Sequence, residues 1–298
     1  MSLRHFLLAF AVVAIWGTNF VVIKIGLRDF PPFFFALLRF FFCALPWLFF
    51  VPRPDVPWRW LAAFGALLGA GQFGLLFFAM RSDVTPGLAS LVIQTQVFFT
   101  IGLSAVLFQE RLRPSAVAGT ALAAAGLAMI AWHLDATVTS RGIALVLGAA
   151  FFWACANLIV KKVAAESRQP VNMLAFMVWS SIFAVPPLAA MFLAFEGPQA
   201  GWSALSGSHA DAWAALAWQV IGNTLFGYAA WGWLLARYEA ATVVPWALLV
   251  PVIGIGSSAI ALGEPLPAWK LEAATIVIAG LAVLTAAPLI ARKRARKV

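Results

Sequence analysis

The chain has 298 residues, of which 63% are hydrophobic and 10% carry a charge. A soluble domain carries roughly 25% charged residues, so most of this surface must face lipid rather than water. The net charge of +9 does not indicate nucleic-acid binding, because the basic residues fall in short gaps between apolar runs and in the C-terminal tail. Both cysteines, Cys43 and Cys155, lie inside apolar runs, which predicts no disulfide.

Ten apolar runs predict ten transmembrane helices, because a spanning helix needs about 20 mainly apolar residues. The first run continues without a small-residue cleavage site, so we interpret it as a retained helix and not as a signal peptide. The stretch 197–211 is more polar, and the number of helices could differ by one there. In chain order the predicted helices are 6–27, 33–51, 60–80, 86–108, 114–132, 142–163, 173–195, 212–236, 241–262 and 268–290.

Lysine and arginine are distributed unevenly between the two sets of loops. With the N-terminus inside, the opposite side holds only Arg28, Arg81, Arg141 and Lys270. The positive-inside rule therefore predicts cytoplasmic N- and C-termini in a multi-pass protein, which we place in a bacterial inner membrane. The cytoplasmic segments would hold Arg4, Arg53, Arg59, Arg111, Arg113, Lys161, Lys162, Arg168, Arg237 and the basic tail.

The sequence contains an internal repeat. Residues 102–110 parallel 256–264 at one constant offset, and the same offset pairs Gly126 with Gly280. Each half would contain five predicted helices, an odd number, so the halves would have opposite orientations. Inverted repeats of this kind give many secondary transporters two alternating gates.

The first helix of each predicted half also carries a matching pair. Trp16 is followed eight residues later by Lys24, and Trp153 is followed eight residues later by Lys161. The fold class we predict is an all-α membrane protein of ten transmembrane helices, built as two inverted five-helix repeats. The predicted repeats are 1–135 and 136–298.

Several short motifs resemble the drug/metabolite transporter superfamily, in particular its ten-helix group with two EamA domains. Pro251 fits the family pattern in the ninth helix, whereas Val97 departs from it in the fourth. Within the family, the chain is similar to YddG-type exporters, which implies efflux of aromatic and other neutral amino acids through a central cavity by alternating access. The matching motifs are Trp-Gly-Thr-Asn-Phe at 16–20, Leu-Arg-Phe at 38–40 and the glutamate turns at 108–112 and 262–266.

Charged residues inside the predicted helices are few and positive. Arg39 lies deep in the second helix, where it would either bind substrate or hydrogen-bond helix-end carbonyls and hold a neighbour in place. Lys24 lies near a helix end and would face the cavity or extend to the interface. We expect structural or gating roles for Arg39, Glu110, Pro251 and Glu264. Because no predicted helix has a carboxylate at its middle, we expect a facilitator or uniporter rather than a proton-coupled carrier.

Amides and aromatic rings supply the candidate substrate site. An amide both donates and accepts hydrogen bonds, so it suits the two charged groups of a zwitterion, although helix-to-helix bonding is the alternative role. Gln94 and Gln96 point roughly 200° apart on a helix, so only one of them should face the cavity. The candidate substrate-binding residues are Trp16, Asn19, Phe20, Lys24, Gln94, Gln96, Trp153, Asn157, Asn223, Tyr228 and Trp246.

Other functions remain to be compared with this one. The same fold could export another metabolite or a drug, with or without proton coupling. An intramembrane enzyme would need a cluster of His, Asp, Glu or Cys at one depth, which the sequence does not show. A receptor or scaffold would need a soluble module longer than these loops. We therefore expect no enzyme activity and no cofactor or metal. The expected partners are a small-molecule substrate and the lipid bilayer, with no nucleic acid and no obligate protein partner.

Overall fold

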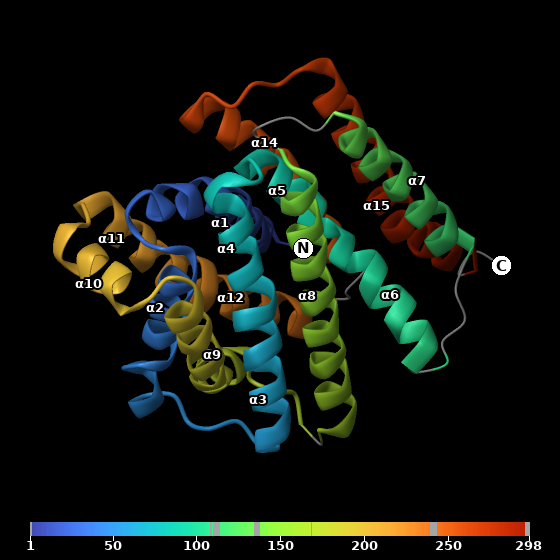
Figure 1. Cartoon of the computed structure of the whole chain (residues 1–298). Helices are drawn as coiled ribbons and strands as arrows, with labels where there is room; N and C mark the ends of the chain where they lie inside the picture. The colour runs from blue at the N-terminus through green and yellow to red at the C-terminus, as the bar shows by residue number, and fades with distance from the viewer. Residues whose placement is uncertain are drawn as a thin grey trace.

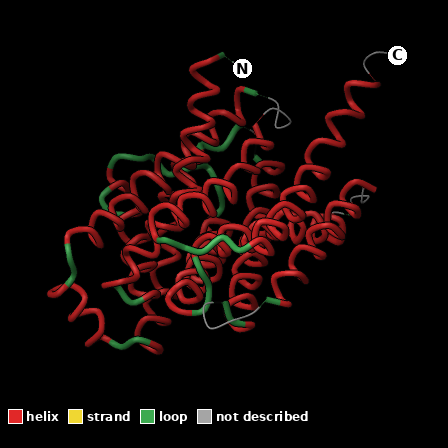
Figure 2. Tube along the Cα trace, turned by 90° about the horizontal axis from the view of Figure 1, so that it is seen from above, coloured by secondary structure: helices red, strands yellow, loops and turns green. Residues whose placement is uncertain are grey.

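The fold is a bundle of helices connected by short loops (Figure 2). A computed structural model describes residues 2–107, 109, 114–133, 138–167, 169–238 and 243–295, and this part of the chain contains no β-strand. Seven helical stretches in it are long and apolar enough to cross a membrane. Three further stretches, 210–237, 244–262 and 268–295, bring the number to the predicted ten.

The first half contains five of these stretches. Two of them join several helical segments without a loop, and prolines begin α2, α5 and α7, where a missing N–H costs nothing. The stretches are α1 (Leu3–Asp29), α2 (Pro32–Ala44) with η1 (Trp47–Phe49), α3 (Trp58–Ala66) with η2 (Leu67–Gly74) and α4 (Leu75–Ser82), α5 (Pro86–Val92) with η3 (Ile93–Thr95) and α6 (Gln96–Leu107), and α7 (Pro114–Trp132).

The second half repeats this order and adds one short helix. The addition is α10 (Pro198–Gly207), which lies in the polar stretch where the sequence left the number of helices open. The predicted ends at 108 and 241 lie outside the described residues. The stretches are α8 (Ser140–Glu166), α9 (Met173–Phe195), α11 (Ala210–Ala217) with η4 (Trp218–Phe226) and α12 (Gly227–Arg237), η5 (Val244–Leu248) with α14 (Leu249–Leu262), and α15 (Ala268–Ala295).

Both halves interrupt their helices at matching places. The third stretch of each half contains a π-helix, η2 or η4, and the fourth contains a 3-10 segment, η3 or η5. The fourth stretch also ends alike, because Gln109 and Gly263 both have left-handed backbones, with φ of 54° and 65°. The sequence offset pairs these two residues. Irregular turns inside helices often mark hinges, so each half has the same two candidate hinge positions.

The fifth helices of the two halves, α7 and α15, pack side by side (Figure 1). A Cβ added at Gly126 would lie 3.1 Å from the carbonyl oxygen of Ala273, and one at Gly280 would lie 2.6 Å from that of Gly119. The repeat offset that pairs Gly126 with Gly280 also pairs Gly119 with Ala273. Each helix thus presents the same surface to the other, as in a two-fold symmetric contact.

The bundle has two chemically different ends. We call the end where α1 begins the basic end and the end where α1 finishes the acidic end. The acidic end also carries five cations, Lys24, Arg28, Arg81, Arg141 and Lys270, but it holds most of the described acidic residues. Described side chains at the basic end include Arg4, Arg53, Arg59, Lys161, Lys162 and Arg237. Those at the acidic end include Asp29, Asp83, Glu196, Asp211 and Glu264.

Candidate functional site

A buried arginine belongs to a polar network that joins α2, η4 and α1. Arg39 on α2 is 0% exposed, and its guanidinium stacks on the ring of Phe73, 3.7 Å from the ring centre. Its Nη1 donates to Oε1 of Gln219 at 2.7 Å, and its Nη2 donates to Oγ1 of Thr224 at 2.9 Å. Its partners are therefore two side chains of the π-helix η4 and not helix-end carbonyls. Neither partner is a carboxylate.

The network continues from η4 to α1. Gln219 donates from Nε2 to Oδ1 of Asn19 at 2.6 Å, and both residues are buried. Thr224 donates from Oγ1 to the carbonyl oxygen of Gln219 at 2.8 Å, five residues earlier, as the wider turn of a π-helix allows. Arg39, Gln219 and Asn19 thus form one chain of hydrogen bonds that crosses three helical stretches.

An aromatic cluster lies beside this chain of hydrogen bonds. The indole ring of Trp16, one turn before Asn19, lies 5.8 Å from the ring of Tyr228 and 5.2 Å from that of Trp231. Its Nε1 donates to the carbonyl oxygen of Asn223 at 3.3 Å. Gly227 packs closely against Trp16, because a Cβ there would lie 2.5 Å from Nε1 of Trp16.

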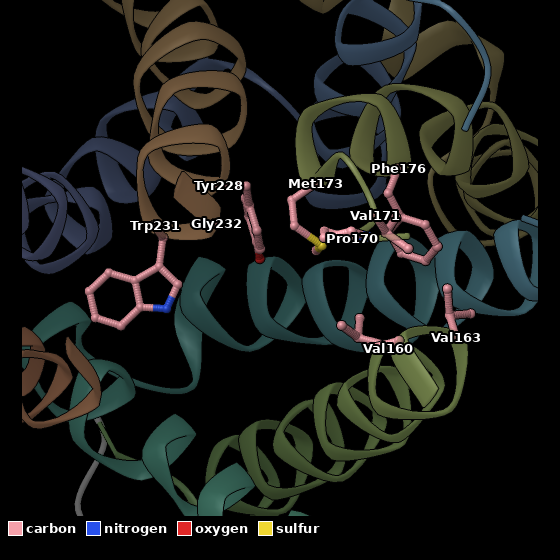
Figure 3. Close-up of a pocket in the computed structure, with 10 residues that line it drawn as sticks. Val160, Val163, Pro170, Val171, Met173, Phe176, Tyr228, Trp231 and Gly232 are labelled. Atoms are coloured by element: carbon pink, nitrogen blue, oxygen red, sulfur yellow. The ribbon is translucent and has the colours of Figure 1, made fainter. Parts of the chain in front are cut away.

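A pocket of about 310 Å³ opens at the basic end, next to this aromatic cluster. Figure 3 shows Met173, Val171 and Phe176 on one wall and Val160 and Val163 on the other. The walls are mainly apolar, as in most small-molecule sites. The lining residues are Val160, Val163, Ala164, Pro170, Val171, Met173, Phe176, Tyr228, Trp231 and Gly232. Of the predicted site residues, Tyr228 is the one that lines it.

The two glutamines of the fourth stretch have different partners. Gln94, on η3, donates to the carbonyl oxygen of Ala247 on η5 at 3.3 Å. Gln96 accepts from Nδ2 of Asn157 on α8 at 2.8 Å. The first bond joins the 3-10 segments of the two halves where they cross, and the second joins a pair of predicted site residues.

The remaining predicted site residues do not join one chamber. Lys24 donates to the carbonyl oxygens of Met80 and Arg81 at the end of α4, at 2.9 and 3.1 Å. Phe20 is buried in the core. Trp153 is half-buried on α8, and the ring of Trp246 contacts that of Phe6. The predicted residues that the structure brings together around η4 are Trp16, Asn19, Asn223 and Tyr228.

Glu264 ties the two halves together at the acidic end. Its Oε2 accepts from the backbone N–H of Gly87 at 2.9 Å, and its Oε1 accepts from Oγ1 of Thr85 and from Nζ of Lys270, the latter at 2.8 Å. This carboxylate therefore holds the start of α5. We call Glu264, Gly87, Thr85 and Lys270 together the Glu264 clasp. Pro251 is buried in α14. Glu110, the residue paired with Glu264 by the repeat, lies outside the described residues.

Several residues outside the predicted set take part in these networks or lie near them, and three of them have long polar side chains. Gln219 and Lys270 bind predicted residues directly, and Gln72 on η2 is buried with no partner for Oε1 among the described residues. All three are polar residues within apolar surroundings. That signal was present in the sequence, but it does not reveal which neighbour a side chain faces.

Another polar group caps a helix at the acidic surface. Asp29, His209 and Asp211 place their ligand atoms within 4.8 Å of one another. Oδ2 of Asp29 accepts from the backbone N–H of His209 at 2.7 Å and lies 3.0 Å from its Nδ1. These contacts fix the start of α11 against the end of α1.

The model of the EamA-like transporter family matches residues 3–132 and 140–286. A probable amino-acid metabolite efflux pump of Salmonella typhimurium is 42% identical over 283 residues, covering 94% of each chain. The protein of the same name in Escherichia coli is 40% identical over the same length, again covering 94% of each chain. These relatives are named as transporters and not as enzymes.

A solved crystal structure shares the fold. It superposes with a TM-score of 0.63 at 20% identity, covering 97% of this chain and 98% of that chain. Each of the two ranges that the family model matches spans five of the ten main helical stretches.

Proposed function

Because the chain belongs to the EamA-like transporter family, we propose that it exports amino acids with uncharged side chains, aromatic ones included, from the cytoplasm. The observation that carries this proposal is the apolar pocket at the basic end, because its lining rings Tyr228 and Trp231 contact Trp16, one turn from the buried amide of Asn19. We call this pocket, together with Trp16 and Asn19, the chamber. The names of the relatives at 42% and 40% identity support export of amino-acid metabolites in general.

The chemistry of the chamber favours zwitterions with apolar side chains. The pocket offers the faces of Trp231 and Tyr228 to a flat or branched side chain. Asn19, one turn from Trp16, supplies amide hydrogen-bonding groups. Gln219 connects Asn19 to the cation Arg39, which would repel a cationic drug.

We propose that the two ends open alternately. At the acidic end α5 packs against α14, where a Cβ added at Gly254 would lie 2.6 Å from Cβ of Ser90. The tight contact at the acidic end and the pocket that opens at the basic end together support a state that is closed at the acidic end and accessible from the basic end.

The orientation in the membrane follows from the distribution of charge. We propose that the basic end, and with it both termini, faces the cytoplasm of a bacterium, because short cytoplasmic loops retain Lys and Arg. Substrate would then enter from the cytoplasm. Reporter fusions test this directly: a fluorescent protein at either terminus should fold and fluoresce, and an alkaline phosphatase fusion there should stay inactive. The reverse pattern would refute this orientation.

We also propose that transport is driven by the substrate gradient alone. Asn19, Arg39, Gln219 and Thr224 form the polar network, and none of them is a carboxylate that could carry a proton. The halves 1–135 and 136–298 would act as the two moving repeats, with small molecules and lipid as the partners. Efflux that required an imposed proton gradient would contradict this mechanism.

Export by intact cells tests the function. Cells that produce the protein are fed dipeptides, and the amino acids released into the medium are measured against cells that carry an empty vector. We expect faster release of neutral amino acids and unchanged release of lysine. Release of other metabolites but of no amino acid would refute the proposal. An Asn19→Leu variant produced at the same level should release neutral amino acids no faster than the empty-vector cells.

A further inference from the structure

We propose that Arg39 is a positioning residue that turns the Asn19 amide so that Nδ2 donates to the carboxylate of the transported amino acid. This inference rests on the proposed function. It assigns the binding of the substrate carboxylate to one atom, Nδ2 of Asn19. It also gives a role to a buried cation that has no acidic partner in its hydrogen bonds.

The direction of every bond in the network follows from Arg39. A guanidinium can only donate, so the side-chain atom of Gln219 that lies 2.7 Å from Nη1 must be the oxygen. The Nε2 group of Gln219 then faces Asn19, 2.6 Å away, and the atom that receives it must be Oδ1. The orientation of an amide is often ambiguous, but here the arginine fixes both amides in sequence.

The free donor of Asn19 therefore lies on the side away from Gln219. Nδ2 donates to no acceptor among the described residues. It is not one of the fully enclosed atoms without a partner, which are Gln72 Oε1, Ser180 Oγ, Ser208 Oγ and Ser258 Oγ. Asn19 is 4% exposed, so Nδ2 is nearly enclosed but keeps a small accessible area.

Asn19 is linked to the pocket at the basic end through Trp16. Trp16 lies three residues before Asn19, on the same face of α1, and its ring contacts Tyr228 and Trp231. Both of these residues line the pocket. A substrate with its side chain among the rings could therefore reach Nδ2 with its carboxylate. The aligned amides also direct the positive end of each dipole toward that carboxylate.

The test replaces Gln219 so that the network reverses. In Gln219→Glu the new carboxylate can accept from Arg39, which preserves the bond that holds η4. It cannot donate to Asn19, so the Asn19 amide should turn, donate to the carboxylate and present Oδ1 to the substrate. The readout is the ratio of the dissociation constants for phenylalanine and phenylalaninamide, measured on purified protein whose thermal unfolding is also recorded.

We expect wild-type protein to bind phenylalanine at least about tenfold more tightly than its amide, since a hydrogen bond to a charged group has that strength. Gln219→Glu should reduce this ratio by about tenfold or reverse it. Thr224→Ser, which keeps an acceptor for Arg39, is the matched control and should leave the ratio unchanged. A loss caused only by a weakened fold would affect both ligands equally.

Asn19→Asp provides a second, independent variant. It can still accept from Gln219, but it has no donor, so it should also lose the preference for the carboxylate. It carries the test if Gln219→Glu does not fold. A wild-type ratio in a folded Gln219→Glu or Asn19→Asp protein would overturn the inference while leaving amino-acid export intact. If wild-type protein exported no amino acid, the proposed function would fail, and this inference would fail with it.

Discussion

The Glu264 clasp should control whether the acidic end stays closed. The side chains of Glu264 and Lys270 are only 5% and 4% exposed, so each neutralises a charge that solvent does not reach. Glu264→Ala would leave Lys270 without its counter-ion and Gly87 without the acceptor for its N–H. Removal of one partner of a buried ion pair typically costs about 3–5 kcal/mol.

The same loss should change the balance between the two ends. If the clasp forms only while the acidic end is closed, a loss of about 3 kcal/mol shifts that equilibrium roughly 100-fold toward opening. The assay labels Ser90→Cys, buried between α5 and α14, with a membrane-impermeant maleimide in a protein whose Cys43 and Cys155 are alanine. Labelling from the acidic side should accelerate strongly when Glu264 is replaced.

Three controls separate the clasp from a general loss of stability. Glu272→Ala removes an exposed carboxylate of the same region and should leave labelling unchanged. Lys270→Met and Glu264→Leu should each destabilise the protein about as much as Glu264→Ala. The double variant Glu264→Leu with Lys270→Met should recover most of that loss, because a matched apolar pair costs little. Additive effects of the two single changes, or an unchanged labelling rate in Glu264→Ala, would refute the role of the clasp.

Two further predictions concern a packed glycine and a half-buried carboxylate. Gly227→Ala should displace Trp16, because Nε1 of Trp16 lies 2.5 Å from the added Cβ, and it should lower both the efflux rate and the stability, the latter by about 1–3 kcal/mol. Gly222→Ala is the control and should be tolerated, because its added Cβ meets its nearest atom only at 3.4 Å. Equal unfolding temperatures of the two variants would contradict this prediction. Burial raises the pKa of Glu196 above its usual range, against the effect of backbone N–H donors such as that of Phe33. The folded state therefore binds the proton more tightly, so wild-type protein should lose stability relative to Glu196→Gln as the pH rises from about 4 to 6, and a gain over that range would contradict the assignment.

Hydropathy and repeat spacing predict most of the fold. The ten helical stretches follow from runs of apolar residues, and the offset found at Gly126 and Gly280 is the one that the structure uses between α7 and α15. The irregular segments were not predictable in the same way. A π-turn depends on side-chain bonds such as those of Thr224 and Arg39, and the sequence does not specify these partners before the helices pack.

The site is less predictable than the fold for a related reason. Lipid-facing and core-facing residues are equally apolar here, so the sequence cannot give the rotation of a helix about its axis. Asn19 and Tyr228 belong to one chamber, whereas Lys24 faces the end of α4 and Gln94 faces η5. Residue type alone could not separate these two groups, and their roles in binding remain predictions.

Efflux through protein locked at the acidic end tests alternating export most directly. A disulfide between Ser90→Cys and Gly254→Cys would join α5 to α14, because the two Cβ positions need only a small shift from 2.6 Å to the usual separation. Labelled phenylalanine would be followed as it leaves proteoliposomes with equal pH on both sides. We predict efflux from reduced protein, none from oxidised protein and recovery with dithiothreitol. Undiminished efflux from fully cross-linked protein would contradict the account.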